Sequence, residues 1–355
     1  MRDRLDALRT AADEAGLGAL LVTFLPDVRW ACGFTGSNGL LLVLPDAAHF
    51  VTDGRYDAQA RAEVTGATVH VPGYDLVGHL AAARLVPQGA RVGVQAEHVT
   101  LAQMAELRAA LPGATLVETT GLVEPLVAVK TPDEVAKIVA AQRITEAVFE
   151  HVCGVLRPGL TERAVAAEIA FEHLRRGCDR LSFDPIVAGG PNGARPHGRP
   201  TDRPLERGDL VVIDMGGVVD GYASDMTRTV ALGDPGDEAR AAYRAVRKAQ
   251  AAAIGAARAG MTGAALDAVA RGVIAGHGFG AHFSHGLGHG IGLQTHEWPR
   301  VSYTNPDPLP DGACVTVEPG VYVEGRFGVR IEDIVQLHAH GCTRLTAADT
   351  ALRVL

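Results

Sequence analysis

The stretch Asp214–Asp225, DMGGVVDGYASD, carries the pattern that decides the fold of the second half of the chain. Its Asp220-Gly221 dipeptide is typical of hairpin turns, and strand-like apolar runs lie on either side. These features predict a β-hairpin. If Asp214 pairs with Asp225, the turn is centred between Val219 and Asp220. The two carboxylates then face each other across the ladder, with β-carbons roughly 4.5–5.5 Å apart.

Two facing carboxylates repel each other unless a cation lies between them. The hairpin alone has a simpler interpretation, because charged residues beside a turn usually form a solvated face. Three later residues change this interpretation. Glu318 follows the apolar run VTV, Glu332 follows VRI, and His289 lies in the glycine-rich stretch HGLGHGIGLQTHE. An unpaired carboxylate beside a buried strand is costly, so the five residues together indicate a shared metal centre.

The charge of this set favours two divalent ions. Four carboxylates and one bridging hydroxide nearly cancel the charge of two such ions, which lie roughly 3.5–4 Å apart in centres that share a water. Ligation mainly by oxygen, with a single imidazole, suits Mn²⁺ better than a structural zinc site, which prefers thiolates. Manganese is therefore the expected metal, with cobalt, zinc or iron as alternatives.

Composition limits the class of protein and its partners. A chain of 355 residues that is 47% hydrophobic and 21% charged is expected to form a globular enzyme of two domains. Its net charge of -8 argues against nucleic acid as a partner. The longest apolar runs are shorter than the roughly 20 residues of a membrane helix, and no membrane partner is expected. Five scattered cysteines and the absence of an export signal at the N-terminus predict a cytoplasmic location.

Apolar periodicity predicts a small α/β domain followed by a larger α+β domain. The pattern loosens around residues 118–132, and Thr131 followed by Pro132-Asp133-Glu134 is typical of the start of a helix. We place the boundary so that residues 1–124 and 125–355 form the two domains. In the second domain, long helices are predicted over 132–156, 161–176, 236–258 and 262–275, with strands over 181–188, 210–232 and after Cys314.

Four motifs resemble those of the pita-bread metallopeptidases that cleave Xaa-Pro bonds, prolidase and aminopeptidase P. They are DMGGVVDGYASDMTRT, SHGLGHGIGLQTHEWP, TVEPGVY and VRIED. The first half resembles the creatinase-type domain of the same family in GFTGSNG and TDGRYDAQA. The resemblance implies a pita-bread catalytic domain after a creatinase-type α/β domain. It also implies that five residues are metal ligands, two of them (Asp225 and Glu332) bridging: Asp214, Asp225, His289, Glu318 and Glu332.

Further catalytic and substrate-binding residues follow from the same motifs. His197, His285 and His296 match the histidines with which this family contacts substrate, and imidazoles can stabilise the developing oxyanion. Glu318 beside the bridging water can take its proton and pass it to the departing nitrogen. Arg330 shares a strand face with Glu332, and two interpretations stay open: it binds a substrate carboxylate, or it neutralises the acidic cluster.

The predicted activity is hydrolysis of Xaa-Pro bonds by attack of a metal-bridging hydroxide. We favour an Xaa-Pro dipeptidase, because a compact chain is adequate for dipeptides, and an Xaa-Pro aminopeptidase acting on longer peptides is the alternative. A metal-free peptide-binding module is a distant third hypothesis, since such relatives typically lose ligand residues and this chain retains all five. The resemblance also implies a homodimer that acts on proline-containing di- or oligopeptides.

Overall fold

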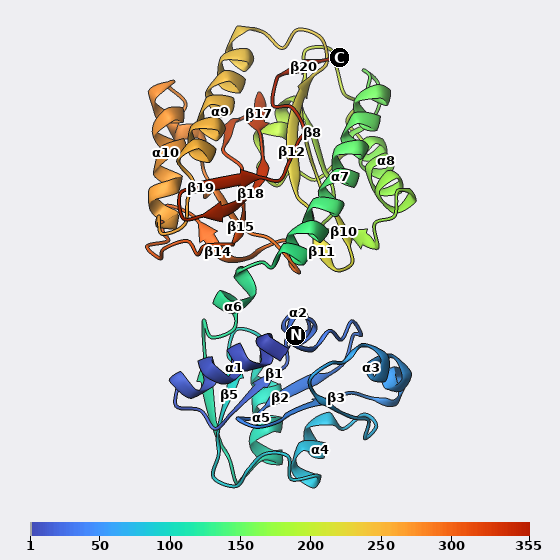
Figure 1. Cartoon of the computed structure of the whole chain (residues 1–355). Coiled ribbons are helices and arrows are strands. Elements are labelled where there is room, and N and C mark those ends of the chain that lie inside the picture. Colours follow the sequence, from blue (N-terminus) through green and yellow to red (C-terminus); the bar gives the residue numbers. More distant parts are fainter. Residues whose placement is uncertain (1) are drawn as a thin grey trace. The chain divides into compact units, whose positions relative to one another are not determined.

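The computed structural model describes residues 2–355. The chain divides into two compact units, Met1–Val127 and Ala128–Leu355, and each is described by itself (Figure 1). The first unit has a mixed six-stranded sheet in the order β4-β3-β2-β1-β5-β6. Its strands are β1 (Ala19–Val22), β2 (Leu40–Val43), β3 (Ala48–Val51), β4 (Thr68–His70), β5 (Arg91–Gln95) and β6 (Thr115–Thr119).

Five helices accompany this sheet: α1 (Arg2–Glu14), α2 (Leu25–Cys32), α3 (Asp57–Glu63), α4 (Leu76–Ala82) and α5 (Leu101–Ala110). Helices α4 and α5 share a buried core with the sheet, where Leu80 and Leu107 join Leu21, Leu42 and Val92. The α/β pattern predicted for this half is therefore confirmed. Helices α2 and α4 were not predicted.

The apolar pattern of the sequence did not predict helix α2 because of Pro26. Pro26 ends the preceding apolar run, but it occupies the first turn of a new helix rather than a loop. Proline suits that position because its fixed φ is helical and the missing N–H would have no partner there. The helix ends at Gly33, whose φ of 90° provides a left-handed cap.

The short helix α6 (Glu124–Ala128) ends at the first residue of the second unit, which then builds two pairs of long helices. These are α7 (Pro132–Val155) with α8 (Glu162–Arg175), and α9 (Asp237–Ala256) with α10 (Gly263–Gly276). The predicted start of α7 is confirmed: Thr131 and Glu134 cap each other's backbone N–H groups. In Figure 1 the two helix pairs lie on opposite sides of the strands of this unit.

Two sheets form the centre of this unit. One has the order β20-β12-β9-β8, and the other β14-β13-β15-β18-β19. Helices α7 and α8 pack on the first, and α9 and α10 pack on the second, so each sheet has its own apolar core. The strands are β8 (Ile186–Gly189), β9 (Leu210–Met215), β12 (Met226–Ala231), β13 (Gly288–Gly290), β14 (Glu297–Val301), β15 (Cys314–Val317), β18 (Asp333–His338), β19 (Gly341–Arg344) and β20 (Arg353–Val354).

Two small ribbons complete the unit. Strands β7 (Arg180–Leu181), β10 (Gly217–Val219) and β11 (Tyr222–Ala223) form one, and β16 (Gly320–Val323) with β17 (Phe327–Arg330) forms the other. Among residues 2–355, no helix combines the length and the apolar character that a membrane span requires.

Candidate metal centre

The hairpin that contains Asp214 and Asp225 is present, but its register differs from the prediction. Asp220 and Gly221 have φ values of 47° and 80°, and both central residues of a type I′ turn require positive φ. This turn is centred between Asp220 and Gly221, so Asp214 pairs with Thr227. The prediction that Asp214 directly faces Asp225 was therefore wrong by two residues.

The shifted register still brings both aspartates to one site. Asp225 lies two residues before Thr227, and alternate residues of an extended chain point to the same side. Ligand atoms of Asp225, His289 and Glu332 all lie within 4.8 Å of one another. Thr227, which pairs with Asp214 across the ladder, donates a hydrogen bond of 2.7 Å to Glu332 Oε2. Thr227 therefore lies at the same centre.

His289 joins the acidic residues from β13. Its Nε2 lies 3.2 Å from Glu318 Oε1 and 3.7 Å from Asp225 Oδ2. Its Nδ1 lies 3.0 Å from the Gly290 carbonyl oxygen, which can only accept a hydrogen bond. The Nδ1 proton is therefore used by the backbone, and Nε2 is the atom that faces the carboxylates, as in a metal-ligating histidine.

Two carboxylate oxygens at this centre show that a cation fits. Of the described residues, only Gln142, Asp214 and Glu332 have buried side-chain oxygen or nitrogen atoms without a hydrogen-bond partner. In the two acids, the atoms without a partner are Asp214 Oδ1 and Glu332 Oε1. The other oxygen of Asp214 accepts a hydrogen bond of 2.7 Å from Arg330, and the other oxygen of Glu332 accepts one of 2.7 Å from Thr227. A buried carboxylate oxygen without a donor is costly, and a divalent ion removes that cost.

The pKa values of the clustered carboxyl groups also favour a bound cation. Burial, followed by repulsion from neighbouring carboxylates, raises the pKa values of Asp225 and Glu332 well above their usual range. Burial opposes ionisation of Glu318 as well, but the hydrogen bond and charge of His289 lower its pKa to about 2. A proton on His289 Nε2 and a metal ion at that atom are alternatives, because a ligating imidazole must be neutral. The donor set fits a divalent-metal centre.

The three other histidines predicted at the site surround this cluster. The ring centroid of His296 lies 4.2 Å from that of His289, and His285 Nε2 lies 2.9 Å from the Tyr322 hydroxyl. Partial desolvation is the main cause that lowers the pKa values of His285 and His296, and the charge of the exposed His197 adds a smaller contribution to both. The structure therefore places His296 beside the candidate ligand His289 and His285 beside Tyr322.

Comparison with known proteins identifies the family. The pattern that defines metallopeptidase family M24 matches residues 136–339, more than half of the chain. The chain belongs to this family. The pattern of the creatinase/prolidase N-terminal domain matches residues 4–128 of the same peptidase. The predicted family, the α+β pita-bread fold and the metal-dependent peptidase class are confirmed.

Relatives of this M24 peptidase match it along its whole length. An uncharacterised peptidase of Bacillus subtilis is 37% identical over 352 residues, which cover 99% of this chain and 100% of the relative. A solved Xaa-Pro dipeptidase from Bacillus anthracis is 36% identical, with a TM-score of 0.96 and 99% of each chain covered. A solved X-Pro aminopeptidase from Thermotoga maritima is 35% identical, with a TM-score of 0.90, covering 98% of this chain and 100% of that one.

Arg330 and Tyr322 form a buried network beside the cluster. The Arg330 guanidinium donates to Asp214 Oδ2, the Thr227 hydroxyl, the Tyr322 hydroxyl and the Pro196 carbonyl oxygen, at 2.7–3.0 Å. Arg330 is only 3% exposed. Sequence reasoning missed Tyr322, although the residue lies in the TVEPGVY motif. Its hydroxyl gains importance through Arg330 on the paired strand β17 and through His285, and no local pattern shows either contact.

Proposed function

We propose that this M24 peptidase hydrolyses Xaa-Pro bonds with two divalent metal ions, and that dipeptides are its preferred substrates. The observation that carries the proposal is the cluster of Asp225, His289 and Glu332, whose ligand atoms lie within 4.8 Å of one another, beside Glu318 and two buried carboxylate oxygens without donors, on Asp214 and Glu332. The printed activities of the solved relatives, an Xaa-Pro dipeptidase and an X-Pro aminopeptidase, support the choice of bond. Asp214, Asp225, His289, Glu318 and Glu332 would hold the ions, with Asp225 and Glu332 bridging them.

The metal ions supply one part of the chemistry. When bound, a pair of divalent ions lowers the pKa of a water molecule and polarises the scissile carbonyl. We propose Mn²⁺ as the native metal, because oxygen ligands dominate the set and no cysteine belongs to it. Cobalt, zinc and iron are the alternatives.

Glu318 is proposed to carry the proton. Its side chain is 17% exposed, against 6% for Asp225, so it is more open to the solvent side from which a substrate enters. Thr316 donates a hydrogen bond of 3.1 Å to its Oε1, which limits the rotation of the carboxylate. Glu318 takes a proton from the attacking water and delivers it to the prolyl nitrogen, which lacks an N–H and must be protonated to leave.

His197, His285 and His296 are proposed to bind substrate and to stabilise the oxyanion. The Nδ1 of His285 lies 2.8 Å from the Gly286 carbonyl oxygen, so its proton is used by the backbone. Its Nε2 lies 2.9 Å from the Tyr322 hydroxyl, and we propose that this edge of the ring acts on substrate together with Tyr322. His296 and His197 are both exposed, which leaves their rings accessible to a peptide.

For Arg330, the contacts support the interpretation that it neutralises the acidic cluster. Four of its five N–H donors already have acceptors, and one of those acceptors is Asp214. A buried guanidinium committed in this way offers little to a substrate carboxylate. We therefore propose that Arg330 holds Asp214 in place, and the substrate-binding role stays a prediction.

Other features of the proposal concern the whole molecule. We propose that residues 1–124 and 125–355 are the two functional domains, and that the chain forms a homodimer, as its family resemblance implies. A cytoplasmic location is supported by the free thiols of all five cysteines, because disulfides are rare in that reducing compartment.

The experiment that tests the activity compares two substrates. The purified chain, loaded with Mn²⁺, is assayed with Ala-Pro and with Ala-Pro-Ala. We expect faster turnover of the dipeptide. Good turnover of the tripeptide with none of the dipeptide would replace the dipeptidase by an aminopeptidase, and turnover of neither substrate would overturn the proposed function.

A further inference from the structure

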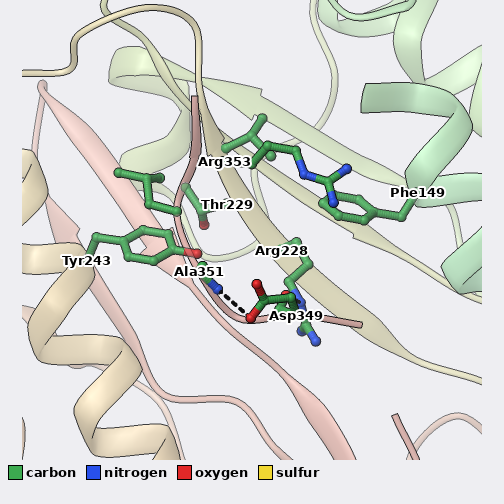
Figure 2. A pocket seen from close by; sticks show the side chains of 9 residues that line it. Phe149, Arg228, Thr229, Tyr243, Asp349, Ala351 and Arg353 are labelled. Atoms are coloured by element: carbon green, nitrogen blue, oxygen red, sulfur yellow. Dashed lines mark hydrogen bonds between the residues drawn. The ribbon is translucent and has the colours of Figure 1, made fainter. Parts of the chain in front are cut away.

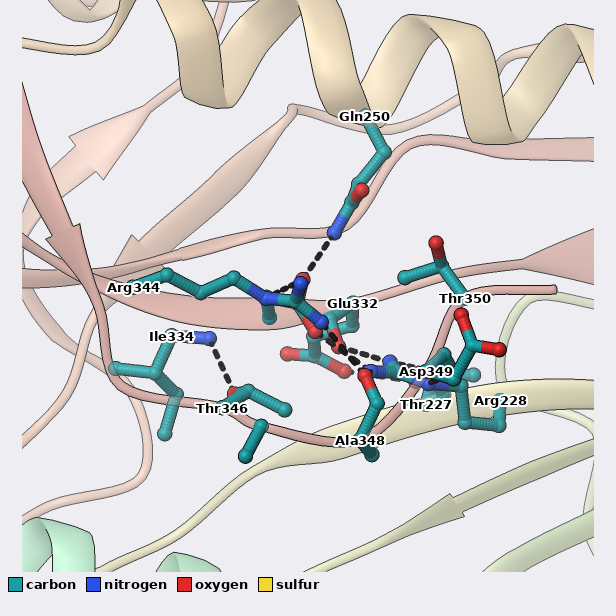
Figure 3. Close-up of polar contacts among 12 residues, drawn as sticks. Thr227, Arg228, Gln250, Glu332, Ile334, Arg344, Thr346, Ala348, Asp349 and Thr350 are labelled. Atoms are coloured by element: carbon teal, nitrogen blue, oxygen red, sulfur yellow. Dashed lines mark hydrogen bonds and ion pairs between the residues drawn. The ribbon is translucent and has the colours of Figure 1, made fainter.

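Arg228, the residue after Thr227 on β12, is the largest fully buried side chain of the described residues. Its five N–H donors meet five acceptors (Figure 3). Two of them are the carbonyl oxygens of Thr227, at 2.9 Å, and of the candidate ligand Glu332, at 2.5 Å. The other three are the Asp333 carboxylate at 2.7 Å and the carbonyl oxygens of Ala348 and Asp349 at 2.9 Å.

Asp333 is the charged partner of this guanidinium. Its Oδ1 accepts from Arg228, and its Oδ2 accepts from Gln250 Nε2 at 2.6 Å and from Arg344 Nε at 2.7 Å. The Arg228 and Asp333 side chains are 2% and 0% exposed. A buried ion pair of this kind contributes little net stability compared with apolar residues of the same size. Its presence beside a candidate metal ligand therefore suggests a role in positioning.

Glu332 is the residue that these contacts hold. It lies between β17 and β18, outside the ladder of either strand. Its N–H donates to the Thr227 carbonyl oxygen at 3.1 Å, and its own carbonyl oxygen accepts from Arg228. Both peptide groups of Glu332 are thus bound by two consecutive residues of β12. Thr227 also binds Glu332 Oε2, so the orientation of Oε1 depends on the same pair of residues.

A neighbouring cavity offers no competing role for Arg228. It has a volume of about 220 Å³ and is bordered by Arg228, Tyr243, Phe149, Asp349 and Arg353, among others (Figure 2). Because all five donors of Arg228 are in use, the guanidinium has none left for a ligand in this cavity. Its contacts are directed to Glu332, Asp333 and the C-terminal segment.

We propose that Arg228 and Asp333 are positioning residues of the metal centre. They hold the backbone of Glu332 so that its free oxygen Oε1 is presented to the ion, and through Arg228 they connect residues 348–349 of the C-terminal segment to metal affinity. The proposal rests on the assignment of Glu332 as a ligand in the proposed function. Partners that orient metal ligands typically change metal affinity by about 10–100-fold when they are replaced.

The test measures binding of Mn²⁺ alone to the full chain after treatment with a chelator, by equilibrium dialysis. Arg228→Lys keeps the positive charge but has three donors in place of five. We expect it to raise the Kd for Mn²⁺ by at least tenfold. The matched control is Arg344→Met, which removes the second ion pair of Asp333. Arg344 donates to Asp333 and to the Ala348 carbonyl oxygen but not to Glu332. The control should change the Kd by less than twofold.

Two outcomes would overturn the positioning role: an Arg228→Lys chain with a Kd within twofold of wild type, or equal effects of Arg228→Lys and Arg344→Met. Circular dichroism and thermal unfolding of the metal-free chains separate a change in affinity from a loss of fold. If Arg228→Lys does not fold, Asp333→Asn takes its place with the same criteria. A wild-type chain that binds no Mn²⁺ would instead refute the metal-ligand assignment itself.

Discussion

Lys130 forms a buried ion pair with Glu297, the residue that follows His296 in the sequence. Their side chains are 1% and 6% exposed. The Lys130 ammonium also donates to the Ala128 carbonyl oxygen at 3.0 Å, and the Gln294 N–H lies 3.4 Å from Glu297 Oε2. The start of the second unit is therefore linked to the segment that carries one of the proposed substrate-binding histidines.

Replacing one partner of this pair should be strongly destabilising. Removing one charge leaves the other buried without its counterpart, which typically costs about 3–5 kcal/mol. We expect Lys130→Met to lower the free energy of unfolding in urea by an amount in this range, and the double variant with Glu297→Gln to recover part of it. Lys137→Met is the control, because Lys137 pairs with Asp220 in solvent and such pairs contribute about 0–1 kcal/mol. Equal losses for Lys130→Met and Lys137→Met would contradict the prediction.

Glu318→Ala should abolish turnover of Ala-Pro, because it removes a residue proposed both as a metal ligand and as the proton carrier. His197→Ala is the comparison variant, since His197 is exposed and belongs to the substrate side of the site. It should lower the activity while leaving the metal content close to that of the wild type. Steady-state kinetics and metal analysis of the same preparations check both. Near-normal turnover by Glu318→Ala would refute the mechanism.

Gly221→Ala should weaken the hairpin that carries the two aspartates. The φ of Gly221 is 80°, and a left-handed conformation costs a residue with a β-carbon about 1–2 kcal/mol. We expect a loss of stability of this size in urea unfolding. Asp220→Asn serves as the control, because asparagine tolerates positive φ and should leave the stability unchanged within about 0.5 kcal/mol. Unchanged stability of Gly221→Ala would show that the turn adapts without strain.

Stability should fall as the pH is lowered, in part because of His173. This side chain is fully buried, with Nδ1 at 2.9 Å from the Ile169 carbonyl oxygen and Nε2 at 3.0 Å from the Thr145 hydroxyl. Burial lowers its pKa in the folded chain. The unfolded chain therefore binds more protons below the ordinary histidine pKa of about 6.5, and acid favours unfolding.

The measurement compares urea midpoints at pH 7.5, 6.0 and 5.0. His173→Asn should lower the stability at pH 7.5 but reduce its loss between pH 7.5 and 5.0. His277→Asn is the control, because His277 is exposed and its replacement should leave the pH dependence as in the wild type. A pH profile of His173→Asn that runs parallel to that of the wild type would contradict the role of His173.

Several features follow from sequence signals that act over a few residues. The start of α7 was predictable because the Thr131 and Glu134 side chains accept from backbone N–H groups only three positions away, and Pro132 has no N–H that needs a partner. The hairpin was predictable because Asp220-Gly221 accepts positive φ. The motifs around Asp214, His289, Glu318 and Glu332 identified the family, because metal chemistry requires those residue types and the family's fold fixes their order.

The register of the hairpin and the contacts behind the ligands were decided by the tertiary structure. A turn centred one residue later places Asp214 opposite Thr227, a difference that the sequence pattern does not resolve. Arg228 reaches Glu332 and Asp333 across more than 100 residues, and Lys130 reaches Glu297 across 167. Such pairs depend on how sheets and helices pack, so no spacing in the sequence records them. The sequence alone therefore determined which residues are the candidate ligands, and the packed fold decided what holds them in place.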